Sequence, residues 1–314
     1  MNASRKYKHR HPSGVSLLEV MFAIGVVGIG LLGVAALLPI AGQQVGMAHV
    51  ADMASVVGRN AFREIDIRGY KRLDMWIDGT GNAYTPPNAT TAFCIDPLYV
   101  ATNGASTLGN MTRVNVRAQA GGTTGLSLAE ADLIFRSHDE LTFDKPDEQL
   151  DPATQKYVTN GTTELRREDE GRMSWFATIV PKRENDGNTS ADLFTLSVVV
   201  ALNRPLTPSA ENEATFGVSN IRSSVAGGDF KLDASFSQLD VREGNWVMLI
   251  GNGSTPNAYR WFRVVAMNEA TRDLTLYGGD WEYAANNTQV VVVRGVVAVF
   301  EKTIRLETSS LWAY

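Results

Sequence analysis

The sequence predicts an α+β protein. We expect a long N-terminal helix that spans a membrane and continues as an amphipathic stem, packed on an antiparallel β-rich extracytoplasmic domain with an added small β-barrel or sandwich. Three observations predict this arrangement. No charged residue occurs among the 19 residues from Val20 to Leu38, and apolar side chains then recur every three or four positions from Met47 to Ile65. The second half of the chain alternates β-rich runs with turn residues.

The apolar run is long enough to be a membrane helix. About 20 residues of helix are needed to cross a hydrocarbon core of roughly 30 Å. A secretory signal has a shorter apolar core and a small-residue cleavage site after it, and here the best downstream candidate is the weak Gly46-Met47-Ala48. Residues 1–14, before the run, contain four basic residues and no acid, which favours a cytoplasmic N-terminus and an extracytoplasmic body.

Composition excludes several classes of protein. The chain has 314 residues, of which 44% are hydrophobic and 20% charged, as in ordinary globular proteins. Its one cysteine, Cys94, cannot form an intramolecular disulfide and rules out a cysteine-based zinc site. The net charge is −5, and residues 1–14 carry +4, so the remainder carries −5 minus +4, or −9. An acidic body argues against nucleic acid as a partner.

A single carboxylate, Glu19, stands at the start of the apolar run, in the sequence Gly14-Val15-Ser16-Leu17-Leu18-Glu19. An acid at this position is costly in lipid and requires a partner. Ser16 and Glu19 fit a capping box that begins a helix. Alternatively, Gly14 is the last residue of a removed leader, and the new N-terminal amine pairs with Glu19. The two interpretations are compatible.

The segment from about residue 5 to residue 68 resembles the N-terminus of type IV pilins and pseudopilins, whose precursors carry a short basic leader that ends in Gly. The resemblance implies that a membrane-bound prepilin peptidase cuts between Gly14 and Val15 and methylates the new N-terminus at Val15. It also implies that Glu19, the fifth mature residue, is the carboxylate of a filament core. The family usually has Phe where this chain has Val15, and a helix-breaking Pro about a turn before Pro39.

Four segments follow from these patterns, and Gly69 is the expected end of the helix. They are a basic leader at 1–14, a transmembrane and stem helix at 15–68, a pilin-like β-sheet domain with loops at 69–203, and a C-terminal β-rich subdomain at 204–314. We expect short strands at 93–100 and 111–118, a hairpin of 174–180 with 193–200, and strands at 246–250, 259–267, 273–277, 289–294 and 296–306. The acidic stretch at 139–151 is expected to be a solvated loop.

No motif predicts an enzyme, a cofactor or a metal. The G-x-G-x-x-G of Gly28–Gly33 has no strand before it and only apolar neighbours, so it does not indicate a nucleotide site. Oxygen-bearing residues alternate in Asp186–Asp192 as in calcium loops, but Ser197 stands where the twelfth-position acid belongs, so a hairpin loop is the better interpretation. After the leader only His49 and His138 remain, without a recognisable catalytic pattern.

These features predict a structural subunit of a type IV pilus or a type II secretion pseudopilus, of the PilV-like minor kind. The expected partners are prepilin peptidase, other pilin or pseudopilin subunits and membrane lipid, and the expected location is the inner (cytoplasmic) membrane, crossed once. The alternative is a membrane-tethered extracytoplasmic binding or hydrolytic domain with an uncleaved N-terminal anchor. Removal of residues 1–14 would distinguish the two.

Overall fold

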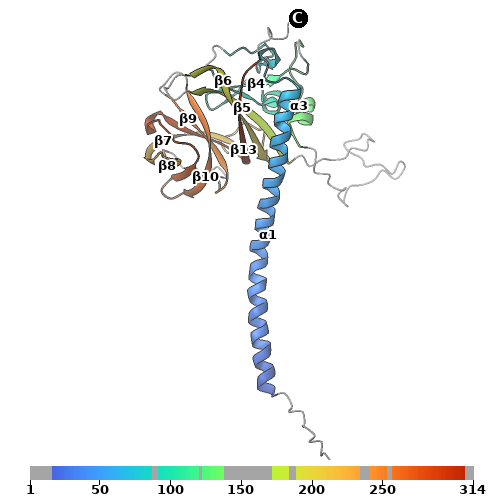
Figure 1. Ribbon diagram of the computed structural model, residues 1–314, viewed down its shortest axis with the longest axis vertical. Coiled ribbons are helices and arrows are strands. Elements are labelled where there is room, and N and C mark those ends of the chain that lie inside the picture. Colours follow the sequence, from blue (N-terminus) through green and yellow to red (C-terminus); the bar gives the residue numbers. More distant parts are fainter. Residues whose placement is uncertain are drawn as a thin grey trace, which may run out of the picture. The chain divides into compact units, whose positions relative to one another are not determined.

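The computed structural model describes residues 16–86, 91–119, 122–137, 172–183, 189–233, 241–252 and 257–307. The chain divides into two compact units, Met1–Val50 and Ala51–Tyr314. It is an α+β protein, in which a long N-terminal apolar helix is followed by a β-rich domain that contains a closed barrel (Figure 1).

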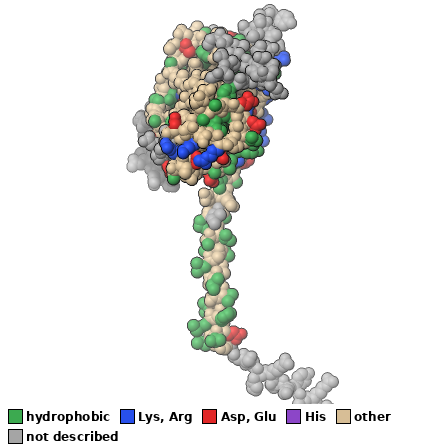
Figure 2. Space-filling model, turned by 90° about the vertical axis from the view of Figure 1, so that its left-hand side faces the viewer, with side chains coloured by type: hydrophobic (Ala, Val, Ile, Leu, Met, Phe, Trp, Pro, Cys, Tyr) green, Lys and Arg blue, Asp and Glu red, His purple; other side chains and the backbone are tan. Residues whose placement is uncertain are grey.

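The first helix, α1 (Leu17–Ile67), continues without interruption through Pro39. In the first unit, every large apolar side chain from Leu17 to Leu38 is exposed. Figure 2 shows hydrophobic side chains along this part of the helix. Among the described residues, α1 is the helix that is long and apolar enough to cross a membrane.

The last part of α1 belongs to the second unit and is amphipathic. Ala54, Val57, Ala61 and Ile65 recur at helical spacing, and all four are buried. The helix ends at Ile67, and Gly69 then adopts a φ of +68°, which favours glycine. The predicted helix end is therefore confirmed.

A mixed sheet forms the first half of the β-rich domain. Its strands are β1 (Trp76–Ile77), β2 (Phe93–Ile95), β3 (Thr107–Leu108), β4 (Met111–Val116), β5 (Met173–Arg183), β6 (Thr189–Leu202) and β13 (Val296–Ile304). The order is β1-β4-β2-β5-β6-β13, with β3 on β4. The expected hairpin of β5 and β6 is confirmed.

The expectation of a purely antiparallel sheet is wrong in one place, because β2 and β4 are parallel. Parallel neighbours need a crossover connection. The short helix α2 (Pro97–Asn103) lies in that connection, where the sequence had indicated a strand at 93–100. Asp96 caps α2 and Pro97 occupies its first turn, so both residues favour a helix start there.

The second half of the domain is a closed six-stranded barrel. Its strands are β7 (Glu213–Ser223), β8 (Gly227–Leu232), β9 (Trp246–Gly251), β10 (Ala258–Asn268), β11 (Asp273–Tyr277) and β12 (Thr288–Val293). Buried side chains such as Phe230, Phe262 and Trp281 fill it, as expected for a small barrel. Strands β7 and β8 were not predicted, whereas strands at all five expected later positions are present.

The last strand leaves the barrel and returns to the sheet. Gly295, with a φ of +85°, turns the chain after β12, and β13 then pairs with β6. The segment predicted as a separate subdomain at 204–314 thus supplies one sheet strand. A shared core joins sheet and barrel, with Phe176 and Val199 on the sheet side and Met248, Ile250 and Trp261 on the barrel side.

Buried charges also join the two halves. Arg204 donates to both carboxylate oxygens of Asp96, at 3.0 and 2.6 Å, and Arg113 Nε lies 3.2 Å from Asp96 Oδ2. Arg113 also pairs with Glu213, the first residue of β7. Burial alone raises the pKa of the Asp96 carboxyl, but Arg204 and Arg113 lower it by more, so the net pKa lies below its ordinary value.

Candidate functional site

The start of α1 is the site that the sequence predicts, and its first turn is capped by Ser16. The Ser16 carbonyl accepts hydrogen bonds from the N–H groups of Glu19 at 3.0 Å and Val20 at 3.2 Å. The Ser16 hydroxyl oxygen accepts from the N–H of Leu18 at 3.3 Å. These bonds satisfy donors that a helix start otherwise leaves without a partner.

Glu19 is an exposed carboxylate in the first turn of this apolar helix. In the part of the chain that the structure describes, no cation lies within ion-pair distance of it. Its position at the helix start suits a negative charge, because the N-terminus of a helix is the positive end of its dipole. Gly14 and Val15 lie outside the described residues, so the predicted cut and the pairing of Glu19 with a new amine stay predictions.

The glycines of Gly28–Gly33 all lie inside α1. The strand, turn and helix that a dinucleotide site requires are therefore not formed around them. A Cβ added at Gly28, Gly30 or Gly33 would meet nothing within 4 Å. These positions leave backbone open on the helix surface, which is the feature that lets helices approach closely in membranes.

The other candidates from the sequence gain no further support as metal or catalytic sites. His49 lies exposed on α1, and His138 is outside the described residues. In the segment Asp186–Asp192, which is expected to be a hairpin loop, residues 186–188 are also outside them, and Thr189 begins β6. No cluster of three or more His, Cys, Asp or Glu residues able to hold a metal ion occurs among the residues with described positions.

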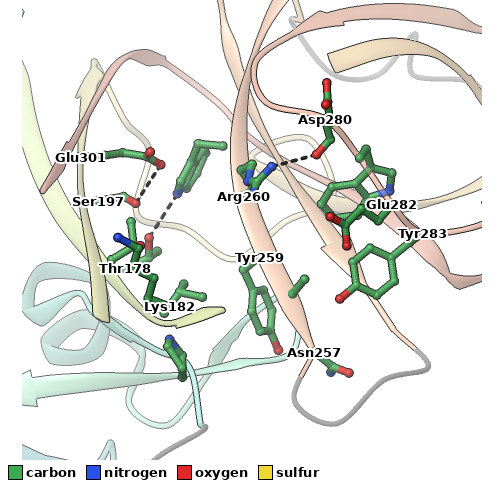
Figure 3. Close-up of a pocket in the computed structure, with 16 residues that line it drawn as sticks. Thr178, Lys182, Ser197, Asn257, Tyr259, Arg260, Asp280, Glu282, Tyr283 and Glu301 are labelled. Atoms are coloured by element: carbon green, nitrogen blue, oxygen red, sulfur yellow. Dashed lines mark hydrogen bonds between the residues drawn. The ribbon is translucent and has the colours of Figure 1, made fainter. Parts of the chain in front are cut away.

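The sequence did not predict a cavity of about 520 Å³ between the sheet and the barrel (Figure 3). Its walls come from β5, β6 and β13 of the sheet, and from the start of β10 and the segment 280–283 of the barrel. These five segments are separated from one another in the chain, so their residues form no motif. The one local signal is Asp280-Trp281-Glu282-Tyr283, in which acids and aromatic residues alternate between β11 and β12.

Neither a family model nor a curated protein matches the chain. Two features stand out: an exposed apolar helix with one carboxylate at its start, and a polar and aromatic cavity in the β-rich domain.

Proposed function

We propose that the chain is a minor pilin or pseudopilin. Prepilin peptidase cuts the precursor after Gly14 and methylates Val15, and the mature subunit assembles through its N-terminal helix into a type IV pilus or a type II secretion pseudopilus. One observation carries the proposal: directly after Gly14-Val15-Ser16, α1 begins and exposes its large apolar side chains together with one acid, Glu19.

The exposed apolar surface of α1 supports assembly because it must be covered. Each square ångström of apolar surface in water costs about 25 cal/mol, and large apolar side chains are exposed at 14 positions from Leu17 to Leu38. Membrane lipid covers this surface before assembly, and the helices of neighbouring subunits cover it in a filament. A purely apolar helix, without an acid, would be sufficient for membrane anchoring alone.

The Glu19 carboxylate supports assembly of the helix with other subunits in a filament. Glu19 would cost several kcal/mol in an apolar core unless a positive group paired with it. Cleavage after Gly14 creates such a group, the α-amine of Val15, in the same part of the chain. A pair between the amine of one subunit and Glu19 of another would fix their register along the filament.

The proposal includes a location and an orientation. Arg5, Lys6, Lys8 and Arg10 precede α1 and keep that end on the cytoplasmic side of the inner membrane, so the β-rich domain lies outside the cytoplasm. The large β-rich domain favours a minor or specialised subunit over a major pilin. The presence of Glu19 argues against the tip subunit of a pseudopilus, which typically lacks this acid.

Processing is the first test. The full-length chain, in membranes that contain a prepilin peptidase, should lose residues 1–14 and gain one methyl group, as measured by intact-protein mass spectrometry. Gly14→Arg should remain uncut, because a bulky side chain blocks the bond, whereas Pro12→Ala in the same leader should be cut normally. A mature chain that retains Met1, or begins near residue 48, would support the membrane-tether alternative.

Assembly is the second test, and α1 offers a matched control. Glu19→Gln should reduce the yield of cross-linked oligomers in membranes by about tenfold, which corresponds to about 1.4 kcal/mol. Asp52→Asn, a change of another exposed acid on α1, should leave the yield unchanged. Equal yields from Glu19→Gln and the wild type would contradict the proposed role of this carboxylate.

A further inference from the structure

The sheet wall of the cavity is a polar row that crosses three strands. Thr178 on β5 is the register partner of Ser197 on β6, and Ser197 is the partner of Glu301 on β13. The neighbouring row on the same face, Phe176 and Val199, is apolar and belongs to the shared core. The face therefore changes from apolar to polar where the cavity begins.

The hydroxyls of this row are buried, and the carboxylate of Glu301 at its end is exposed. The exposed fractions of Thr178 and Ser197 are 0% and 2%. Thr178 Oγ1 accepts a bond of 3.2 Å from the indole N–H of Trp261, which joins the buried part of the row to the barrel. Ser197 Oγ donates to Glu301 Oε1 at 3.2 Å, so the second carboxylate oxygen can accept a bond from a ligand (Figure 3).

The barrel wall is aromatic. Tyr259 at the start of β10 and Tyr283 before β12 both line the cavity and are only partly buried (Figure 3). The ring of Tyr283 lies against the backbone of Gly251, where an added Cβ would be 2.5 Å from the ring. The glycine therefore permits this placement of the ring.

The charges of the cavity are mixed in sign. Lys182 and Arg260 are opposed by Asp280, Glu282 and Glu301, and both signs occur on both walls. Arg260 Nη1 donates to the backbone carbonyl of Asp280 at 2.8 Å, which holds the guanidinium at the edge of the cavity. Such a lining has no excess of positive charge for a phosphate or a polyanion. It provides many donors and acceptors for a neutral ligand.

We propose that this cavity binds a neutral sugar unit of a glycan. A sugar presents hydroxyls that can donate to the exposed carboxylate of Glu301 and accept from Lys182 and Arg260, and an apolar C–H face that can pack on a tyrosine ring. The cavity volume of about 520 Å³ lies within the range of ligand sites, about 300 to 1,000 Å³. An extended peptide is the rival occupant, but it would bind mainly through strand edges. The polar groups described here are side chains on a sheet face.

Binding can be tested with the full-length chain in a polyoxyethylene detergent, which carries no sugar. The probes are maltohexaose, cellohexaose, xylohexaose and chitohexaose, tested by saturation-transfer NMR and titrated by calorimetry. At least one should bind with a Kd of about 1 mM or tighter. The result should be the same for Gly14→Arg, so its outcome is separable from that of the processing test.

Matched variants locate the binding. Glu301→Gln and Tyr259→Leu should each weaken it about tenfold or more. Glu269→Gln and Tyr277→Leu, changes of the same kind on barrel side chains outside the cavity, should leave it unchanged. Glu282→Gln, at an exposed cavity residue, replaces Tyr259→Leu if that variant does not fold.

Four outcomes would overturn the proposal. These are no signal from any of the four probes, binding that the cavity variants leave unchanged, binding of polygalacturonate alone, and binding of an extended Thr/Val-rich decapeptide that the cavity variants abolish.

Discussion

Between Leu17 and Leu38 every large apolar side chain of α1 is exposed, whereas between Ala54 and Ile65 the apolar face of the same helix is buried. The backbone conformation is the same in both parts, and only the side-chain pattern differs. An apolar stripe on one side is satisfied by packing within the chain. A surface that is apolar on all sides requires lipid or other chains to cover it.

The acids of the two units differ in the same way. Asp96, in the second unit, is buried and contacts two arginines, Arg113 and Arg204. Glu19, in the first unit, is exposed in an apolar stretch. The second unit thus satisfies its buried charge internally, while the first leaves both apolar surface and charge to be satisfied from outside. This contrast is the physical basis for proposing an assembly helix.

The strongest test of the contrast introduces the same acid into both parts of α1. Ile65 is 0% exposed and Ile29 is 76% exposed. Ile65→Asp should lower the free energy of unfolding of the β-rich domain by more than about 4 kcal/mol, because it buries an unpaired charge. Urea unfolding of the full-length chain in micelles, followed by tryptophan fluorescence, measures this change.

Ile29→Asp is the matched control. It should leave the unfolding midpoint of the domain unchanged, but raise the free energy of membrane insertion of α1 by about 3 to 4 kcal/mol. Flotation of the chain with lipid vesicles measures insertion. If Ile29→Asp destabilised the domain as strongly as Ile65→Asp does, the two parts of α1 would not be independent.

The buried charge cluster gives the next largest effect. Asp96→Asn leaves the shape of the side chain but removes the negative charge between Arg113 and Arg204. The uncompensated charge should cost about 3 to 5 kcal/mol of stability, measured by urea unfolding. The control is Glu64→Gln, which removes an exposed pair with Arg68 on α1 and should cost less than about 1 kcal/mol.

The stability of Asp96→Asn should also depend on pH differently from that of the wild type, and the sign of the difference can be worked out. The folded-state pKa of Asp96 is below its ordinary value of 3.8, so its stabilisation is complete above pH 3.8 and is lost as the pH falls below it. Burial raises the pKa of Glu213, despite the opposing effect of Arg113, so its contribution has the opposite sign. The Asp96 charge is one of the groups that raise the pKa of Glu213, so the difference between the two proteins reports Asp96 together with its effect on Glu213. Below pH 3.8 the stability of Asp96→Asn should fall less steeply than that of the wild type. Parallel curves would contradict the assignment.

Local patterns predicted much of the fold. The helical period in the last part of α1 is visible in the sequence because one face of it is buried. Strands β5 and β6 are visible as runs rich in apolar and β-branched residues, because most of their residues are buried on both faces. The helix α3 (Leu128–Phe135) was missed, although Ser127 and Glu130 form a complete capping box at its start. Strand β7 was missed because its burial pattern is irregular and few of its residues are fully buried, and β8 was missed because it is short and begins with two glycines.

The two candidate sites differ in how far they can be recognised from the sequence. Gly14, Val15 and Glu19 lie within six residues, so a resemblance could identify them from the sequence. The residues of the cavity come from five separate segments, and their association depends on the return of β13 to the sheet. A turn at Gly295 does not reveal which strand the chain will pair with next.

The smallest predicted effect applies one substitution to two glycines of α1. A Cβ at Gly58 would lie 2.3 Å from the Phe300 ring on β13, whereas a Cβ at Gly46 would meet nothing within 4 Å. Gly58→Ala should therefore destabilise the domain by about 1 to 3 kcal/mol through overpacking, partly offset by the better helix propensity of alanine. Gly46→Ala gains only that propensity, and because it lies in the first unit it should leave the melting temperature of the domain unchanged. Adding Phe300→Leu to Gly58→Ala should recover part of the loss, because the smaller side chain gives the new methyl group room. Equal melting temperatures for Gly58→Ala and the wild type would mean that this part of α1 does not pack on β13 in solution.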